Sequence, residues 1–148
     1  MGDSTFKNRP ITFPQGWSTK TRGSEIGSNR YRSDRSFVND QGKIVCIAES
    51  SSTNDRKVGV GELCLADKFF ADSESAGILI FSLCGRSQYP PTPKLQAKYL
   101  EPYFRHLKRI DRVHGVRELY FISESDFESL AWIALNEDFL AKAVALKA

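Results

Sequence analysis

The sequence predicts an α/β fold, in which a mixed central sheet is flanked by helices. Strand-like and helix-like segments alternate from residue 36 onwards, an order typical of a sheet covered by helices. Residues 77–84, GILIFSLC, form a continuous apolar run of strand length, which indicates a strand covered on both faces. Apolar residues recur at helical spacing over 93–110. A chain of 148 residues is long enough to bury one hydrophobic core.

The α/β domain is expected to begin with a β-hairpin. Residues 36–39 and 43–49 are rich in β-branched and aromatic types and flank Gln41-Gly42, a tight-turn signal. A helix follows and ends near residue 72. Because Gly59 and Gly61 each disfavour a helix by about 1 kcal/mol, we expect its regular part to start near Gly61.

The second half of the chain predicts two further strands and two further helices. These are a strand, a helix, a strand and a final amphipathic helix, expected at 77–84, 93–110, 117–123 and from Asp126 to the C-terminus. Pro102 lies within the first of these helices and is expected to kink it.

The first 35 residues are expected to form a basic, loop-rich arm ahead of a single α/β domain at 36–148. Prolines and glycines interrupt any regular period there. The chain has a net charge of +3, and all of the positive excess lies in this first quarter. Such an arm is typical of a protein that binds a polyanion, although a solvated basic tail gives the same pattern.

Composition excludes several classes of protein. No apolar run approaches the roughly 20 residues that a membrane-spanning helix needs, and the N-terminal residues lack the apolar region of a secretory signal. The three cysteines show no CxxC spacing, which argues for reduced thiols, a cytoplasmic location and no structural zinc.

Two acidic residues are predicted to meet at one edge of the sheet. Glu49 ends the apolar run Ile44–Ala48, at the position where open α/β sheets bind ligands. Asp34 precedes the first strand of the hairpin, so strand pairing brings it close to Glu49. Two carboxylates at one place suit Mg²⁺ or Mn²⁺, which prefer oxygen ligands. Asp40 is the competing partner, but it fits a turn at the far end of the hairpin. Glu49 is equally explained as the point where the strand leaves the core.

Asp34, the hairpin and the sequence IAESSS at 47–52 resemble the core of the PD-(D/E)XK, or restriction-endonuclease-like, nucleases. In that family an Asp is followed by an acid, any residue and a lysine at a strand end, and then by a helix, a strand and a helix. The resemblance implies that Asp34 and Glu49 hold Mg²⁺ and that Ser51 stands in the lysine position. Serine also replaces the proline that precedes the Asp in the family.

The same resemblance implies hydrolysis of nucleic-acid phosphodiester bonds, with DNA favoured over RNA. Lys57 is then a lysine supplied from the following helix, and Glu62 an additional acid at the start of that helix. Two symmetric copies would be the usual way to cut both strands of a duplex.

Several polar residues around the two acids are candidates for nucleic-acid contacts. Arginine side chains near a metal site clamp phosphates, and hydroxyls at a helix N-terminus favour anions. The candidates are Arg30, Arg32, Arg35, Ser52, Thr53 and Arg86.

Other interpretations of these residues remain open. A binding module without catalysis would use the serine-rich turn as a phosphate cradle for a nucleotide or nucleic acid. In an interaction domain the same hydroxyl run would only cap the following helix. The arginines would then neutralise Asp34. Cys84, at the end of the buried strand, is a further candidate nucleophile, but it lacks an evident partner base.

Overall fold

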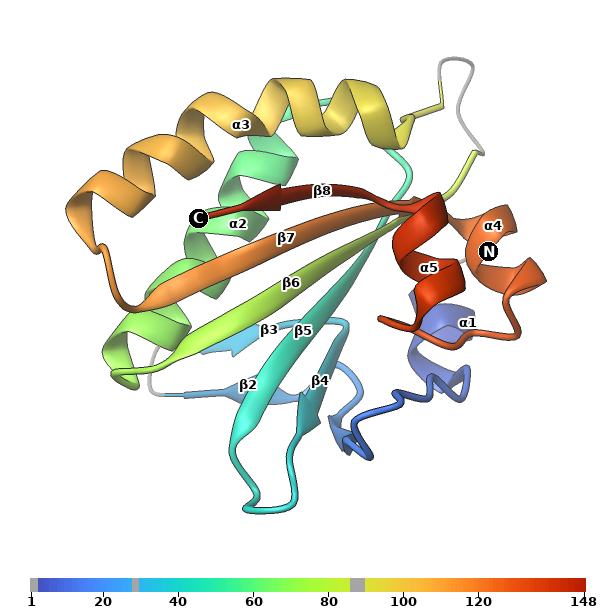
Figure 1. Cartoon of the computed structure of the whole chain (residues 1–148), viewed down its shortest axis with the longest axis horizontal. Coiled ribbons are helices and arrows are strands. Elements are labelled where there is room, and N and C mark those ends of the chain that lie inside the picture. The colour runs from blue at the N-terminus through green and yellow to red at the C-terminus, as the bar shows by residue number, and fades with distance from the viewer. Residues whose placement is uncertain (1–2, 28–29, 86–89) are drawn as a thin grey trace.

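A computed structural model describes residues 3–27, 30–85 and 90–148. Its centre is a six-stranded mixed sheet in the order β1-β4-β5-β6-β7-β8 (Figure 1). Strands β5, β6 and β7 are parallel, whereas β1, β4 and β8 pair antiparallel with their neighbours. The strands of this sheet are β1 (Ser18–Thr21), β4 (Arg35–Val38), β5 (Ile44–Ser51), β6 (Ala76–Leu83), β7 (Gly115–Ser123) and β8 (Val144–Lys147). The predicted α/β fold with a mixed sheet is therefore confirmed.

Helices cover both faces of the sheet. One face packs against α2 (Arg56–Asp72) and α3 (Pro93–Ile110), the crossovers between the parallel strands, and against residues of a small second sheet, β2 (Glu25–Ile26) and β3 (Tyr31–Arg32). The other face packs against three short helices, which lie together in Figure 1. They are α1 (Asp3–Asn8), α4 (Glu124–Ser129) and α5 (Glu137–Lys142).

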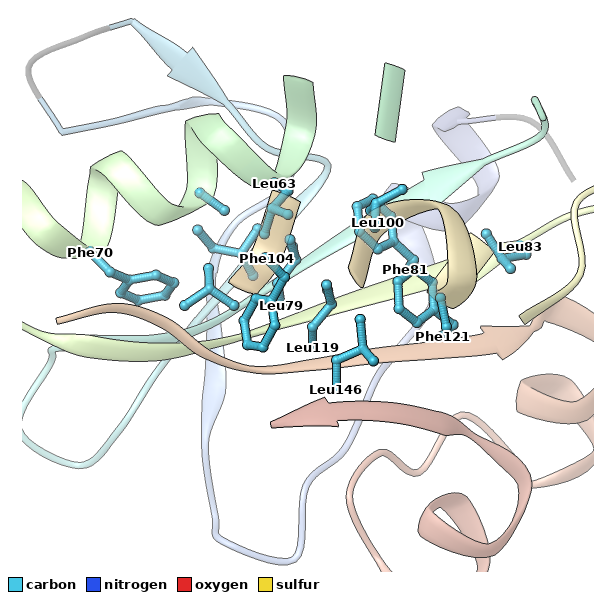
Figure 2. Packing of buried hydrophobic residues seen from close by; sticks show 14 of the residues in the cluster. Leu63, Phe70, Leu79, Phe81, Leu83, Leu100, Phe104, Leu119, Phe121 and Leu146 are labelled. Carbon is cyan, nitrogen blue, oxygen red and sulfur yellow. The ribbon is translucent and has the colours of Figure 1, made fainter. Parts of the chain in front are cut away.

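The core beneath α2 and α3 is built from alternate residues of the central strands (Figure 2). The rings of Phe81 and Phe121 stack across β6 and β7, with centroids 5.4 Å apart. Gly77 at the start of β6 leaves room for Phe70, because a Cβ there would lie 2.2 Å from the ring. Close packing of this kind fixes how α2 lies on the sheet.

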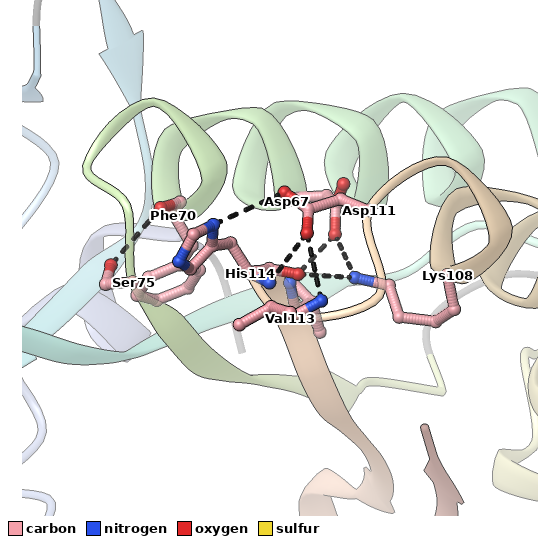
Figure 3. Close-up of polar contacts among 8 residues, drawn as sticks. Asp67, Phe70, Ser75, Lys108, Asp111, Val113 and His114 are labelled. Atoms are coloured by element: carbon pink, nitrogen blue, oxygen red, sulfur yellow. Dashed lines mark hydrogen bonds and ion pairs between the residues drawn. The ribbon is translucent and has the colours of Figure 1, made fainter.

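A buried ion pair joins α2, α3 and the start of β7 (Figure 3). Asp67 Oδ1 accepts hydrogen bonds from Lys108 Nζ at 2.7 Å and from the backbone N–H of Val116 at 2.8 Å. Gly115 has φ +85° and no side chain, and a Cβ at this position would lie 2.2 Å from Asp67 Oδ1. This pair fixes α2 relative to the sheet, which matters because α2 also borders the candidate site.

Helix α2 begins earlier than the sequence suggested. It starts at Arg56, and the side chain of Asp55 caps it by accepting from the N–H of Lys57. Gly59 is buried against Leu100 of α3, and an added Cβ would lie 3.1 Å from that side chain. Close approach of the two helices, together with the Asp55 cap, outweighs the low helix propensity of glycine.

The predicted final helix from Asp126 to the C-terminus is wrong. The chain forms α4 and α5 instead, and then adds β8 to the edge of the sheet. Ala131, Trp132 and Leu135 have positive φ, a conformation incompatible with a continuing helix, and Asn136 starts α5 as its N-cap. The predicted helix at 93–110 is confirmed as α3, which continues through Pro102.

Residues 1–35 are more ordered than the arm we expected. They contribute α1, an edge strand of the main sheet and the small second sheet. Phe6, Ile11 and Phe13 are buried in the core on the side of α1, α4 and α5. The backbone of Thr12 also pairs with the segment around Ile133. The N-terminal segment is therefore part of the packed domain. Within the described ranges, no helix is both long and apolar enough to cross a membrane.

Candidate functional site

The hairpin brings Asp34 and Glu49 together. Arg35 pairs with Ala48 in the register of β4 and β5, so the residues just beyond them, Asp34 and Glu49, lie opposite each other. The backbone N–H of Asp34 donates to Glu49 Oε1 at 3.3 Å, and that of Ser50 donates to Asp34 Oδ2 at 2.8 Å. Each acid is thus held through a backbone group of the opposite strand.

Glu49 points to the same face of the sheet as Ile47, which is the face covered by α2 and α3. There it meets Tyr31 from β3, a buried residue whose hydroxyl donates to Glu49 Oε1 at 3.0 Å. Oε1 therefore has two donors, while Oε2 accepts no hydrogen bond from any residue that the structure describes. Oε2 is the atom of Glu49 that is open to a further ligand.

Like charges surround the Glu49 carboxylate. Glu49 is only 6% exposed, and burial raises its pKa well above the ordinary value. The charges of Glu62 on α2 and of Asp34 raise this pKa further, and the hydrogen bonds from Tyr31 and from the Asp34 backbone only partly offset them. Burial and the neighbouring Glu49 also raise the pKa of the Tyr31 hydroxyl. A cation at this place would offset the repulsion among the carboxylates.

A basic side chain from α1 reaches the site, and sequence reasoning did not single it out. Lys7 of α1 lies with its Nζ 4.0 Å from Asp34 Oδ1. In the sequence Lys7 is one of several bases in the first 35 residues, and nothing in its spacing points to Asp34. The role of Tyr31 was missed for the same reason, because only the tertiary fold places β3 beside the end of β5.

The carboxylates of Asp34 and Glu49 supply oxygen atoms, the kind of ligand that a hard divalent cation takes. In the described part of the chain, no three acidic, histidine or cysteine side chains are grouped so that they could hold a metal ion. Mg²⁺ is commonly bound by one or two carboxylates and keeps several waters, so the pair meets that requirement.

The serine-rich turn contributes mainly structural contacts. Ser51 ends β5, and its carbonyl accepts from the N–H of Cys84 at 2.8 Å. Thr53 Oγ1 accepts from the N–H of Asp55, whose own carboxylate caps α2. A carboxylate thus occupies the place that a phosphate would take at this helix N-terminus. Lys57, in the first turn of α2, and Ser52 are both exposed.

The candidate arginines have different environments. Arg35 is fully buried, and its guanidinium donates to the carbonyls of Phe6 and Arg9 and to Thr19 Oγ1. Its predicted role in nucleic-acid binding is therefore wrong, because β4 turns its side chain into the core. Arg30 is exposed, and Arg32 is exposed and pairs with Glu25 at 3.2 Å. Arg86 lies outside the described residues.

The two other residues considered from the sequence lie apart from this chemistry. Asp40 is exposed in the turn that joins β4 to β5, at the opposite end of the hairpin from Asp34. Cys84 is buried, with its Sγ 3.5 Å from the carbonyl of Ser51.

The chain matches no protein-family model, and no curated protein or solved structure is significantly similar to it.

Proposed function

We propose that this protein is a Mg²⁺- or Mn²⁺-dependent nuclease of the restriction-endonuclease-like type. The observation that carries the proposal is the convergence of Asp34 and Glu49, which are distant in sequence, at the end of β5. The order of elements that follows, α2, β6 and α3, agrees with the order that the family resemblance implies.

Asp34 and Glu49 would hold the cation. When bound, the cation would act as a Lewis acid that lowers the pKa of a water molecule and offsets negative charge on the phosphoryl oxygens. The chain itself positions the two ligands. Tyr31 and the backbone N–H of Asp34 fix Oε1 of Glu49, so that Oε2 is presented. The N–H of Ser50 fixes Oδ2 of Asp34 in the same way. Preorganised ligands reduce the entropy lost when metal and substrate bind.

The reaction is the addition of one water across a phosphodiester. The water oxygen bonds to phosphorus, one bridging P–O bond breaks, and the departing oxygen gains a proton while the attacking water loses one. The products are a hydroxyl and a phosphomonoester. The carboxylates remain ionised, and the chain forms no covalent bond to the substrate.

DNA is the substrate class that we propose, in keeping with the basic residues near Asp34. Arg30 and Arg32 are exposed on the segment that leads to Asp34 and would contact phosphates beside the cleaved bond. Two copies of the chain related by a twofold axis would allow each to cut one strand.

The proposal is tested by following cleavage of supercoiled plasmid, linear duplex and single-stranded RNA with Mg²⁺, Mn²⁺ or EDTA. We expect cleavage with either metal, none in EDTA, and loss of cleavage in Glu49→Ala. Asp40→Ala removes an exposed carboxylate from the opposite end of the same hairpin and is the matched control, with expected wild-type rates. Duplex binding without metal-dependent cleavage would instead favour a binding module and contradict the nuclease.

A further inference from the structure

Lys7 is held beside Asp34 by contacts on both sides of it in the chain. The buried guanidinium of Arg35, the residue after Asp34, donates to the carbonyl of Phe6 and to that of Arg9. The Phe6 side chain is fully buried. The backbone on either side of Lys7 is therefore fixed to β4, so that the placement of Lys7 beside Asp34 is built into the fold.

The aliphatic part of Lys7 is also fixed. It lies over Gly23, where an added Cβ would be 3.0 Å from both Cε and Nζ of the lysine. Gly23 has φ +98°, a conformation that glycine adopts readily and other residues rarely do. The side chain of Lys7 thus runs along glycine backbone towards Asp34.

The Lys7 ammonium is near Asp34 but keeps its hydrogen-bond donors. The Nζ–Oδ1 distance of 4.0 Å is beyond hydrogen-bond length, and no described residue accepts a hydrogen bond from Nζ. The Lys7 side chain is 34% exposed and that of Asp34 is 14% exposed, so the lysine is the more accessible of the two to a ligand from solvent. A charge placed in this way can contact an anionic ligand that approaches Asp34 from solvent.

We infer that Lys7 is a catalytic residue that contacts a non-bridging oxygen of the scissile phosphate. The inference rests on the proposed nuclease function. Negative charge develops on the phosphate oxygens as water attacks, and a fixed ammonium stabilises it. The substrate site then requires α1, a segment far from the hairpin in sequence.

The test compares wild type with Lys7→Met, Lys7→Arg and Lys43→Met. Methionine keeps the aliphatic chain over Gly23 but removes the charge, arginine restores it, and Lys43 is an exposed lysine beside the turn at the opposite end of the hairpin. Thermal unfolding of each variant shows that it is folded. Plasmid cleavage in Mg²⁺ is the first measurement. The second, which is independent of activity, is the salt dependence of binding to a fluorescent 20-base-pair duplex in EDTA.

Lys7→Met is expected to slow cleavage by roughly 10²-fold, the order found when one stabilising donor is removed, with partial recovery in Lys7→Arg. For Lys7→Met, the slope of log affinity against log salt concentration should be shallower than that of wild type by about one unit, as expected for the loss of one phosphate contact. Lys43→Met should match wild type in both. If wild type cleaves and Lys7→Met cleaves equally fast, the inference is overturned and the nuclease stands. If wild type does not cleave, the nuclease fails, and the inferred phosphate contact is kept or rejected by the change in salt slope.

Discussion

Tyr31→Phe removes a single oxygen from the site and tests whether the chain prepares Glu49 for a metal ion. Tyr31 is 6% exposed and its ring belongs to the core beneath α2, so phenylalanine preserves the packing. The lost group is the hydroxyl that donates to Glu49 Oε1 at 3.0 Å. Among the residues that the structure describes, the backbone N–H of Asp34 is then the one remaining donor to that carboxylate.

The size of the effect follows from the charge of the acceptor. A hydrogen bond to an ionised group contributes about 1.5–3 kcal/mol. This bond lowers the pKa of Glu49, which burial and the neighbouring acids raise. Without this hydrogen bond the pKa of Glu49 rises further, so a smaller fraction of Glu49 is in the ionised form that binds metal. At about 1.4 kcal/mol for each factor of ten, we expect Mn²⁺ affinity at neutral pH to fall by roughly ten- to a hundredfold.

The assay is a Mn²⁺ titration followed by electron paramagnetic resonance of the free ion between pH 6 and pH 9. Because Tyr31→Phe raises the pKa of Glu49, its loss of affinity should be greatest at the acidic end and should shrink as pH rises. Tyr120→Phe is the matched control, since the Tyr120 hydroxyl also donates to a glutamate, Glu118, at 3.1 Å, but on β7. Equal Mn²⁺ affinities for the two variants would refute the reasoning.

Three further predictions follow from the buried charges. Asp67→Asn should lower the free energy of unfolding in urea by about 3–5 kcal/mol, because it leaves the Lys108 ammonium buried without its counterion. Asp72→Asn, which alters an exposed ion pair, should lower it by less than about 1 kcal/mol. Equal losses would contradict the role of the Asp67–Lys108 pair in fixing α2. Arg35→Met should lower the free energy of unfolding in urea by about 4.5 kcal/mol or more, at about 1.5 kcal/mol or more for each of the three hydrogen bonds that the guanidinium donates; an unchanged free energy of unfolding would contradict its structural role. Glu49→Gln should raise the melting temperature at neutral pH but not below about pH 4. The pKa of Glu49 is raised in the folded protein, so its ionisation destabilises the fold only at pH values above the ordinary glutamate pKa. A gain in melting temperature that persisted at acidic pH would exclude this electrostatic origin.

The sequence was most informative where local patterns decide structure. The apolar run at 77–84 and the capped segment at 93–110 match β6 and α3 almost residue for residue. Strand pairing in a hairpin depends on a short turn, so the meeting of Asp34 and Glu49 could be anticipated. These features require little knowledge of distant contacts.

Contacts between distant segments could not be anticipated in the same way. Arg35 looked like a phosphate ligand because it is basic and lies next to Asp34, but alternation along β4 places it in the core beside α1. Tyr31 and Lys7 reach the site from β3 and α1, and the sequence contains no short-range signal for either contact. The helical period after Asp126 also gave no sign of Ala131 and Trp132, two non-glycine residues with positive φ, of which Trp132 packs in the core on the side of α1, α4 and α5.

The central claim is that Asp34 and Glu49 share one divalent cation. Calorimetric titration of Mn²⁺ into wild type, Asp34→Asn, Glu49→Gln and Asp40→Asn tests it most directly. We predict one ion per chain for wild type and Asp40→Asn, and loss of that ion in both Asp34→Asn and Glu49→Gln. Mn²⁺ binding that survives either single substitution, or no binding to wild type, would contradict the account.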